Sequence, residues 1–408
     1  MMHARFLRAA LAVAVVALVA ACATSKHSAK PAELTKFVST ARIERVWSAV
    51  VGAGEPKKRL GLSVAVAGDA VFVANHQGRV VAYNQASGKQ LWSTATRLPL
   101  SGGPGAGDGL VVAGASHGDI IALDAATGAV KWKAYVNSEI LSAPVIGKDI
   151  VALRTVDGRV VALRASDGTE LWSNEQSPPR LSLRGTARPT IVGNFVISGF
   201  DNGRLQALQL STGGTAWDAI VTNAGGKTEL ERLNDIDTQV AVQGNDIYVA
   251  GFQGKVARID LESGETQWSR DASSYAGLAV DADSLYISTA AGTILKLASS
   301  NGLQAWEQTL LSNRRLSPPA VLGEFVVVAD FEGYVHFFNR ATGEPAGRVH
   351  SLTGRVTAVP VVAGDTVFLR DTEGRVVALR ATLVEPGAGT VVTPAGSGSE
   401  GTRRNGPR

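Results

Sequence analysis

Two glycines and a tryptophan recur along the chain with a period of about 40 residues. In the first copy they are Gly78, Gly88 and Trp92, and a strand-like apolar stretch begins seven residues before the first glycine, at Val71. Five more copies keep the same internal spacing and end in the tryptophans Trp132, Trp172, Trp217, Trp268 and Trp306. A fixed period of this length indicates a solenoid or a propeller, in which each unit buries its apolar surface only against its neighbours.

Turn residues and short apolar stretches decide between these two architectures. Each copy has alternating apolar residues on both sides of its first glycine, and dipeptides such as Asp157-Gly158, Asn202-Gly203 and Thr127-Gly128 favour tight hairpins. A further apolar stretch, for example 142–146, precedes each copy. Four antiparallel strands in about 41 residues match one blade of a β-propeller, and the chain is therefore predicted to be all-β.

The last two copies are incomplete, and they predict how the ring closes. The seventh copy has Gly347 where the tryptophan is expected, and the eighth, from Val367 to Gly374, ends before its second hairpin. Trp47 lies upstream of the first full copy and has no blade of its own. A strand around Trp47 would complete the eighth blade and remove the open seam between the first and last blades. We predict an eight-bladed β-propeller of four-stranded antiparallel blades closed by this N-terminal strand; a seven-bladed ring with the last copy as a cap is the alternative.

The amino terminus has the composition of an export signal. Arg5 and Arg8 precede 13 uninterrupted apolar residues (9–21), a run too short to span a bilayer as a stable helix. Cys22, the only cysteine of the 408 residues, directly follows Val19-Ala20-Ala21. This arrangement resembles the bacterial lipobox, which implies that residues 1–21 are removed as a signal peptide and that Cys22 is lipidated. An ordinary signal peptide with an Ala-x-Ala cleavage site is the alternative.

The residues around the predicted propeller indicate its location and its boundaries. Ala23 is not the aspartate that retains lipoproteins in the inner membrane, so resemblance to that sorting rule implies the periplasmic face of the outer membrane. Residues 22–40 are small, polar and weakly basic, and are predicted to be a lipidated tether. The propeller is assigned to residues 41–382, and the Gly-, Pro- and Ser-rich residues 383–408 to a disordered tail.

The composition argues against several kinds of function. A single cysteine permits no internal disulfide and no paired-cysteine zinc site. The six histidines occupy no common repeat position, and the sequence contains no phosphate-binding glycine loop and no recognisable nucleophile–base pair. The formal charge of +4 is not concentrated in a basic stretch, as a nucleic-acid interface would require. We therefore predict no catalytic residue, no metal, no cofactor and no nucleic-acid partner.

The repeat resembles that of a known enzyme family. The segment Ala122-Leu123-Asp124, followed by Thr127-Gly128 and Trp132, is similar to the tryptophan-docking repeat of the quinoprotein dehydrogenases, and the similarity extends over residues 41–382. Membership would imply pyrroloquinoline quinone, a bound calcium ion, a catalytic aspartate and an adjacent cysteine pair. With Cys22 as its only cysteine the chain cannot form that pair, and no clustered carboxylates and amides indicate a calcium site. The resemblance therefore predicts the fold and not the activity.

A lipobox followed by eight such copies resembles the BamB lipoproteins of the outer-membrane β-barrel assembly (BAM) complex. This resemblance implies a non-catalytic scaffold that aids folding and insertion of β-barrel proteins. Its implied partners are the periplasmic domains of BamA, the other BAM subunits, unfolded outer-membrane barrel proteins and the lipid that receives the acyl anchor. The alternative function is a quinone-dependent dehydrogenase-like or ligand-binding periplasmic propeller.

Two insertions interrupt the repeat and are the candidate partner-binding loops. The connection from a tryptophan to the next strand start is 19 residues after Trp92 and Trp132, but 24 after Trp172 and 30 after Trp217. Long loops on a regular scaffold often carry binding function. Because the two insertions are consecutive, they should emerge on the same rim from neighbouring blades.

The insertions contain two strings that are similar to the BamA-contacting surface of BamB. The basic first insertion has Leu181-Ser-Leu183-Arg184, and the acidic second has Arg-Leu-Asn-Asp235-Ile-Asp237. The resemblance implies that Leu181 and Leu183 are apolar anchors and that Arg184 donates to a partner carboxylate or carbonyl, with Asp235 and Asp237 orienting it. An internal Arg184–Asp235 ion pair in loops that merely cap the propeller is the alternative.

Overall fold

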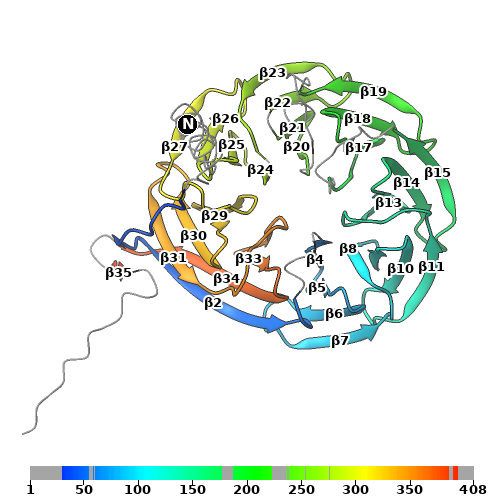
Figure 1. The fold of residues 1–408 in the computed structure, drawn as a ribbon, viewed down its shortest axis with the longest axis horizontal. Helices are drawn as coiled ribbons and strands as arrows, with labels where there is room; N and C mark the ends of the chain where they lie inside the picture. The colour runs from blue at the N-terminus through cyan, green and yellow to red at the C-terminus, as the bar shows by residue number, and fades with distance from the viewer. Residues whose placement is uncertain are drawn as a thin grey trace, which may run out of the picture.

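The described part of the chain forms a closed ring of eight antiparallel β-sheets (Figure 1). The computed structural model describes residues 30–54, 58, 60–176, 187–222, 236, 239–252, 254–274, 276–385 and 389–393. Within these residues all regular elements are strands. Each sheet is one blade, and its strands follow one another from the centre of the ring to its outer wall.

Blades I to IV follow the chain in order. Blade I consists of β4 (Val64–Ala67), β5 (Ala70–Ala74), β6 (Arg79–Asn84) and β7 (Gln90–Ala95). Blade II consists of β8 (Leu100–Gly107), β9 (Leu110–Ala115), β10 (Asp119–Asp124) and β11 (Val130–Tyr135), with β3 (Gly61–Leu62) added parallel to β8. Blade III consists of β12 (Val145–Gly147), β13 (Ile150–Arg154), β14 (Arg159–Arg164) and β15 (Glu170–Glu175). Blade IV consists of β16 (Thr190–Val192), β17 (Phe195–Gly199), β18 (Arg204–Gln209) and β19 (Thr215–Ile220).

Blades V to VIII complete the ring, and only the last takes a strand from elsewhere in the chain. Blade V consists of β20 (Ala241–Gln243), β21 (Asp246–Ala250), β22 (Lys255–Asp260) and β23 (Thr266–Asp271). Blade VI consists of β24 (Gly277–Val280), β25 (Ser284–Ser288), β26 (Ile294–Ala298) and β27 (Gln304–Gln308). Blade VII consists of β28 (Ala320–Leu322), β29 (Phe325–Ala329), β30 (Tyr334–Asn339) and β31 (Pro345–His350). Blade VIII consists of β32 (Val361–Ala363), β33 (Thr366–Arg370), β34 (Arg375–Leu383) and, from the N-terminus, β2 (Ala41–Val50).

The predicted ring count and closure are confirmed. Strand β2 pairs antiparallel with β34 along its whole length, with Trp47 opposite Ala378. This pairing completes the eighth blade, so the seven-bladed alternative is wrong. The physical reason is edge removal, because without β2 the β34 strand would present unpaired N–H and C=O groups to solvent.

The core lies between adjacent blades rather than in one central cluster. One apolar cluster joins Phe72 and Trp92 of blade I to Ile121 and Leu123 of blade II, and equivalent clusters fill the other seams. Since both faces of a middle strand are buried, strands such as β13 have no exposed residue at all. The repeat therefore places apolar residues on both faces of the inner strands and polar residues mainly on the outermost strand.

Every tryptophan of the repeat docks on the next blade. Each indole Nε1 donates a hydrogen bond, 2.7–3.3 Å long, to a backbone carbonyl in the third turn of that blade, and each ring covers the turn glycine. The donor and acceptor pairs are Trp47–Gln85, Trp92–Ala125, Trp132–Ala165, Trp172–Leu210, Trp217–Leu261, Trp268–Ser299 and Trp306–Arg340.

The missing seventh tryptophan has a structural explanation. Blade VIII has no turn between its third and fourth strands, because β2 comes from the N-terminus, so a tryptophan at position 347 would find no turn glycine. Gly347 instead leaves room for the side chain of Ile43 on β2, whose Cδ1 lies 2.8 Å from where a Cβ would be. Ser39 Oγ and Thr40 N also donate hydrogen bonds to Ala346 O of blade VII. The N-terminal segment thus replaces tryptophan docking at this seam.

The described parts of the predicted tether and tail differ from the prediction. Strand β1 (Phe37–Val38), within residues 22–40, pairs with β35 (Val391–Val392), within residues 383–408. This two-stranded ribbon lies on the outer wall beside β31 (Figure 1). A run of two apolar residues is too short to predict a strand, and pairing between segments so far apart in the sequence leaves no local signal.

Candidate partner-binding rim

The two insertions leave the propeller at one rim. They lie between β15 and β16 and between β19 and β20, so they flank blade IV and share the rim that carries the turns between second and third strands. The predicted contact residues Leu181, Leu183, Arg184, Asp235 and Asp237 lie outside the described residues, as does Cys22. Their arrangement stays a prediction. The structure does describe the part of the rim from which both insertions start, and we call this part the insertion base.

A buried ion pair forms the centre of this base. Arg154, the last residue of β13, donates from Nη2 to Asp201 Oδ1 in the turn after β17, and the two side chains are only 4% and 5% exposed. The guanidinium also lies over the Phe200 ring, 5.2 Å from its centroid. Because charges without partners are costly to bury, this pair fixes blade III against blade IV in one register.

The second insertion returns onto the same turn. Ile236, the single described residue between 223 and 238, is fully buried, and its N–H donates to Phe200 O at 3.2 Å. Its Cγ2 occupies the space next to Gly199, where an added Cβ would lie only 2.4 Å away. Ile236 is therefore held at the turn that also carries Asp201.

A half-buried cation lies where the described chain resumes after the first insertion. It is Arg188, and burial lowers the pKa of its guanidinium. Among the described residues, no hydrogen-bond acceptor is found for the buried atoms Arg154 Nε, Arg154 Nη1 and Arg188 Nε. Guanidinium N–H groups that lack an acceptor favour carboxylates and carbonyl oxygens as partners.

The repeat pattern distinguishes Arg154 from the residues at the equivalent position in most other blades. The last position of the second strand holds a small residue in six blades, and these are Ala74, Ala115, Gly199, Ala250, Ser288 and Ala329. The exceptions are Arg154 in blade III and Arg370 in blade VIII. Arg370 is also enclosed, and burial lowers its pKa to about 10. Asp201 carries no comparable signal, because Asp-Asn-Gly is an ordinary turn sequence.

A second cluster of buried charges lies on blade VII. Asp330 accepts hydrogen bonds from Arg314 Nε at 2.8 Å and from His336 Nε2 at 3.0 Å, and Arg314 also pairs with Glu332. Burial lowers the pKa of His336, so its imidazole is neutral at pH 7 and donates to the carboxylate. Burial opposes ionisation of Asp330, but the hydrogen bonds from His336 and Arg314 and the charge of Arg314 outweigh it and lower the pKa of Asp330.

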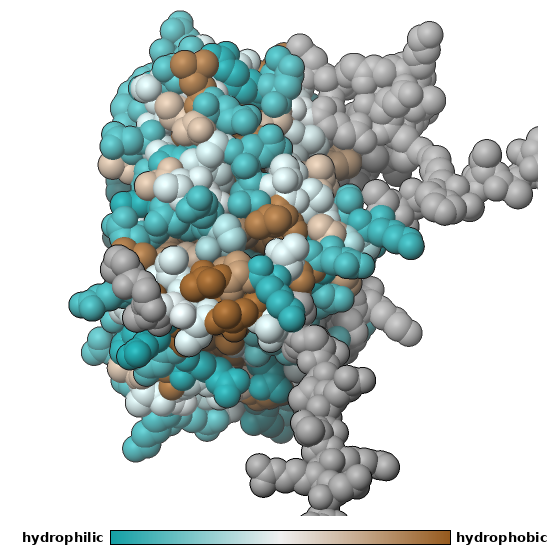
Figure 2. Space-filling model, turned by 90° about the vertical axis from the view of Figure 1, so that its left-hand side faces the viewer, coloured by the Kyte–Doolittle hydropathy of each residue, from teal (hydrophilic) through white to brown (hydrophobic). Residues whose placement is uncertain are grey.

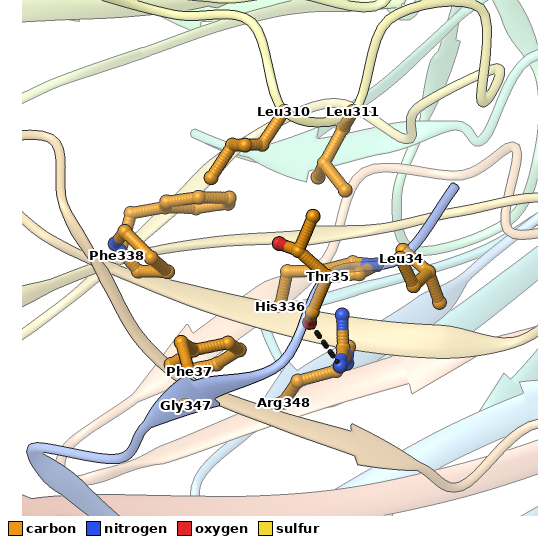
Figure 3. Close-up of a pocket in the computed structure, with 10 residues that line it drawn as sticks. Leu34, Thr35, Phe37, Leu310, Leu311, His336, Phe338, Gly347 and Arg348 are labelled. Atoms are coloured by element: carbon orange, nitrogen blue, oxygen red, sulfur yellow. Dashed lines mark hydrogen bonds between the residues drawn. The ribbon is translucent and has the colours of Figure 1, made fainter. Parts of the chain in front are cut away.

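This cluster holds the N-terminal segment. Arg314 Nη1 donates to Ala32 O at 3.0 Å, and Arg348 Nη2 donates to Thr35 O at 2.9 Å (Figure 3). A small pocket remains between segment and blade, lined by Leu34, Thr35, Phe37, Leu310, Leu311, His336, Phe338, Pro345, Gly347 and Arg348. Since the segment itself forms one wall, the pocket is a packing junction between segment and blade.

The described residues show neither a metal cluster nor a spanning helix. No group of three or more His, Cys, Asp or Glu side chains in the described ranges is arranged to hold a metal ion. Across the same ranges, no helix has the length and apolarity needed to cross a bilayer. The absence of metal, cofactor and catalysis stays a prediction.

Comparison with known proteins identifies the family. The model of the family "Outer membrane protein assembly factor BamB" matches residues 38–98, 95–308 and 290–383. BamB of Pseudomonas aeruginosa is 45% identical over 370 residues, covering 91% of this chain and 97% of the relative. The chain belongs to the BamB family. BamB of Alkalilimnicola ehrlichii is 44% identical and covers 93% of this chain and 97% of that relative.

Solved structures agree on the fold of this BamB-family chain. The crystal structure of BamB from Moraxella catarrhalis has a TM-score of 0.77 at 28% identity and covers 83% of this chain and 100% of its own. The quinohemoprotein alcohol dehydrogenase from Comamonas testosteroni has a TM-score of 0.64 at 16% identity, a likeness of fold alone. The predicted recognition and the eight-bladed fold are thus confirmed, and the BamB relatives are named as assembly factors rather than as enzymes.

Proposed function

We propose that this chain is a non-catalytic scaffold of the outer-membrane β-barrel assembly complex, anchored by a lipid on Cys22 at the periplasmic face of the outer membrane. The observation that carries the proposal is the near-complete coverage of relatives named outer membrane protein assembly factor BamB, at 44–45% identity. A single cysteine at the end of an apolar leader supports the anchor.

The partner surface in this proposal is the rim that carries the two insertions, and the partner is the periplasmic part of BamA. Leu181 and Leu183 supply apolar anchors, and Arg184, Asp235 and Asp237 supply charged contacts. The buried Arg154–Asp201 pair supports this assignment because it joins blades III and IV at the rim where both insertions begin. Such preorganisation reduces the entropy that binding must overcome.

The first test is co-purification of the tagged lipoprotein from detergent-solubilised outer membranes. The expected result is recovery of the barrel-assembly subunits, and their absence would contradict the proposed function. Mass spectrometry of the mature N-terminus tests the anchor separately, because lipidation adds the mass of the acyl chains to Cys22.

The second test changes Leu181, Leu183 and Arg184 together to alanine. We expect lost binding of BamA with an unchanged urea midpoint. A matched control is Arg164→Ala, because Arg164 pairs with Asp167 in an exposed turn of blade III on the opposite rim. Undiminished binding in the triple variant, or equal loss in the control, would refute the assignment of the rim. Dye reduction by the purified protein with pyrroloquinoline quinone would instead favour a dehydrogenase.

A further inference from the structure

The ribbon of β1 and β35 carries apolar side chains on both of its faces. Phe37 and its partner Val392 are half-buried, and the Arg348 guanidinium lies over the Phe37 ring, 5.4 Å from its centroid. On the other face the paired residues Val38 and Val391 are 59% and 65% exposed. Antiparallel ribbons packed on a core normally turn polar residues outward. Within the described part of the chain, this outer face is therefore an apolar surface that nothing covers.

A further exposed apolar residue lies close to the ribbon along the chain. Leu383, at the end of β34, is 54% exposed, and the adjacent Val384 N–H donates to Thr40 O, two residues from Val38. Figure 2 faces this side of the ring and shows hydrophobic surface gathered among hydrophilic surroundings. Elsewhere, exposed aliphatic residues such as Val130 and Leu171 are single residues on the outer strands of separate blades. Grouped apolar exposure marks an interaction site more often than single residues do.

The ribbon is already fixed to the propeller without any partner. Residues 32 and 35 accept hydrogen bonds from Arg314 and Arg348, and Thr40 N donates to Ala346 O at 2.9 Å. Ser39 N also donates to Thr390 O at 2.8 Å, which joins the two chain ends. The apolar face is thus preformed and has a constant orientation relative to blades VII and VIII.

The chain length between anchor and ribbon limits what can cover this face. Ten residues separate Cys22 from Ala32, and a fully extended chain of that length spans at most about 35 Å. Residues 30–45 also carry the basic side chains Lys30, Lys36, Arg42 and Arg45 against the acids Glu33 and Glu44. A basic excess near an apolar surface favours contact with anionic lipid headgroups.

We propose that the face formed by Val38, Val391 and Leu383 inserts into the interfacial region of the membrane to which Cys22 is anchored, as a second lipid contact. The inference rests on the proposed anchor. Since blades VII and VIII lie across the ring from blades III and IV (Figure 1), this contact turns the insertion-bearing rim segment away from the bilayer. The scaffold is then oriented by two points, and its partner-binding loops stay accessible to periplasmic domains.

The experiment uses the full-length lipoprotein in vesicles of phosphatidylethanolamine and phosphatidylglycerol. A cysteine introduced as Val391→Cys is labelled with an environment-sensitive fluorophore, because acylation blocks the thiol of Cys22. Val130→Cys is the matched control, because Val130 is 50% exposed and belongs to β11, which lies across the ring from β35 (Figure 1). The expected result is a blue shift and quenching by spin-labelled lipid at position 391 and neither at position 130. Adding Val38→Ser to the labelled Val391→Cys variant should reduce both signals.

Flotation of the same samples separates failure of this inference from failure of the anchor. Protein that floats with vesicles but gives equal signals at positions 391 and 130 retains the anchor and overturns the lipid contact. Protein that does not float overturns both. Protection of position 391 that arises only after barrel-assembly subunits are added also overturns the lipid contact, since the ribbon then binds protein.

Discussion

Two glycines of blade II test the docking of tryptophan on the neighbouring blade. Gly109 lies in the turn between β8 and β9, and Gly128 lies in the turn between β10 and β11; both have φ of +74°. A Cβ on Gly109 would meet no atom within 4 Å, whereas on Gly128 it would lie 2.5 Å from Cε3 of Trp92. The two positions therefore have the same backbone strain, but only Gly128 lies against the indole of Trp92.

The two alanine variants should differ in stability by the cost of that overlap. A left-handed conformation costs a non-glycine residue about 1–2 kcal/mol, and this applies to both Gly109→Ala and Gly128→Ala. Overpacking against a fixed ring adds about 1–3 kcal/mol at Gly128 alone. We expect the free energy of unfolding to fall by about 1–2 kcal/mol in Gly109→Ala and by about 2–5 kcal/mol in Gly128→Ala.

Equilibrium urea unfolding, followed by circular dichroism, measures these differences in the mature chain. The control is a Trp92→Ala background, in which the penalty of Gly128→Ala should decrease to that of Gly109→Ala because no indole remains to be displaced. Equal losses in the two single variants, or a Gly128→Ala penalty that persists without the indole, would show that tryptophan docking does not determine this turn.

Three further predictions concern the buried charges and the insertion base. Asp330→Asn should lower stability at pH 7 by about 3–5 kcal/mol, because Arg314 loses its buried partner. Because the pKa of Asp330 is lowered in the folded state, its contribution to the free energy of unfolding is present above about pH 4 and is lost as pH falls through the folded pKa. The stabilities of variant and wild type should therefore converge in acid. A difference that stays constant with pH would contradict this. Gly199→Ala should displace Ile236 and weaken BamA binding about tenfold in a pull-down titration, whereas unchanged affinity would separate this turn from the binding surface. Arg348→Met should accelerate hydrogen exchange of β1 relative to β13, and equal exchange would show that Arg348 does not hold the segment.

The candidate binding surface was only partly accessible from the sequence. The two insertions stand out because they lengthen connections that elsewhere measure 17 to 20 residues, and the contact residues in them follow from resemblance rather than from geometry. The base beneath them needed the structure, since Arg154 and Asp201 are 47 residues apart and meet only because blades III and IV are adjacent. The one sequence feature that indicated this ion pair was an arginine at a repeat position where most blades have a small residue.

The sequence by itself determined the blades, their number and the closure of the ring. These features are local, because a turn glycine and a tryptophan at fixed spacing impose one hairpin geometry in each repeat, and Trp47 supplies the strand that the last copy lacks. Only the tertiary structure decided where the chain ends lie. Phe37–Val38 and Val391–Val392 become strands because Arg314, Arg348 and Ala346 hold the first segment in place as a template for the second. Such pairing depends on proximity created by ring closure, and no local pattern encodes it.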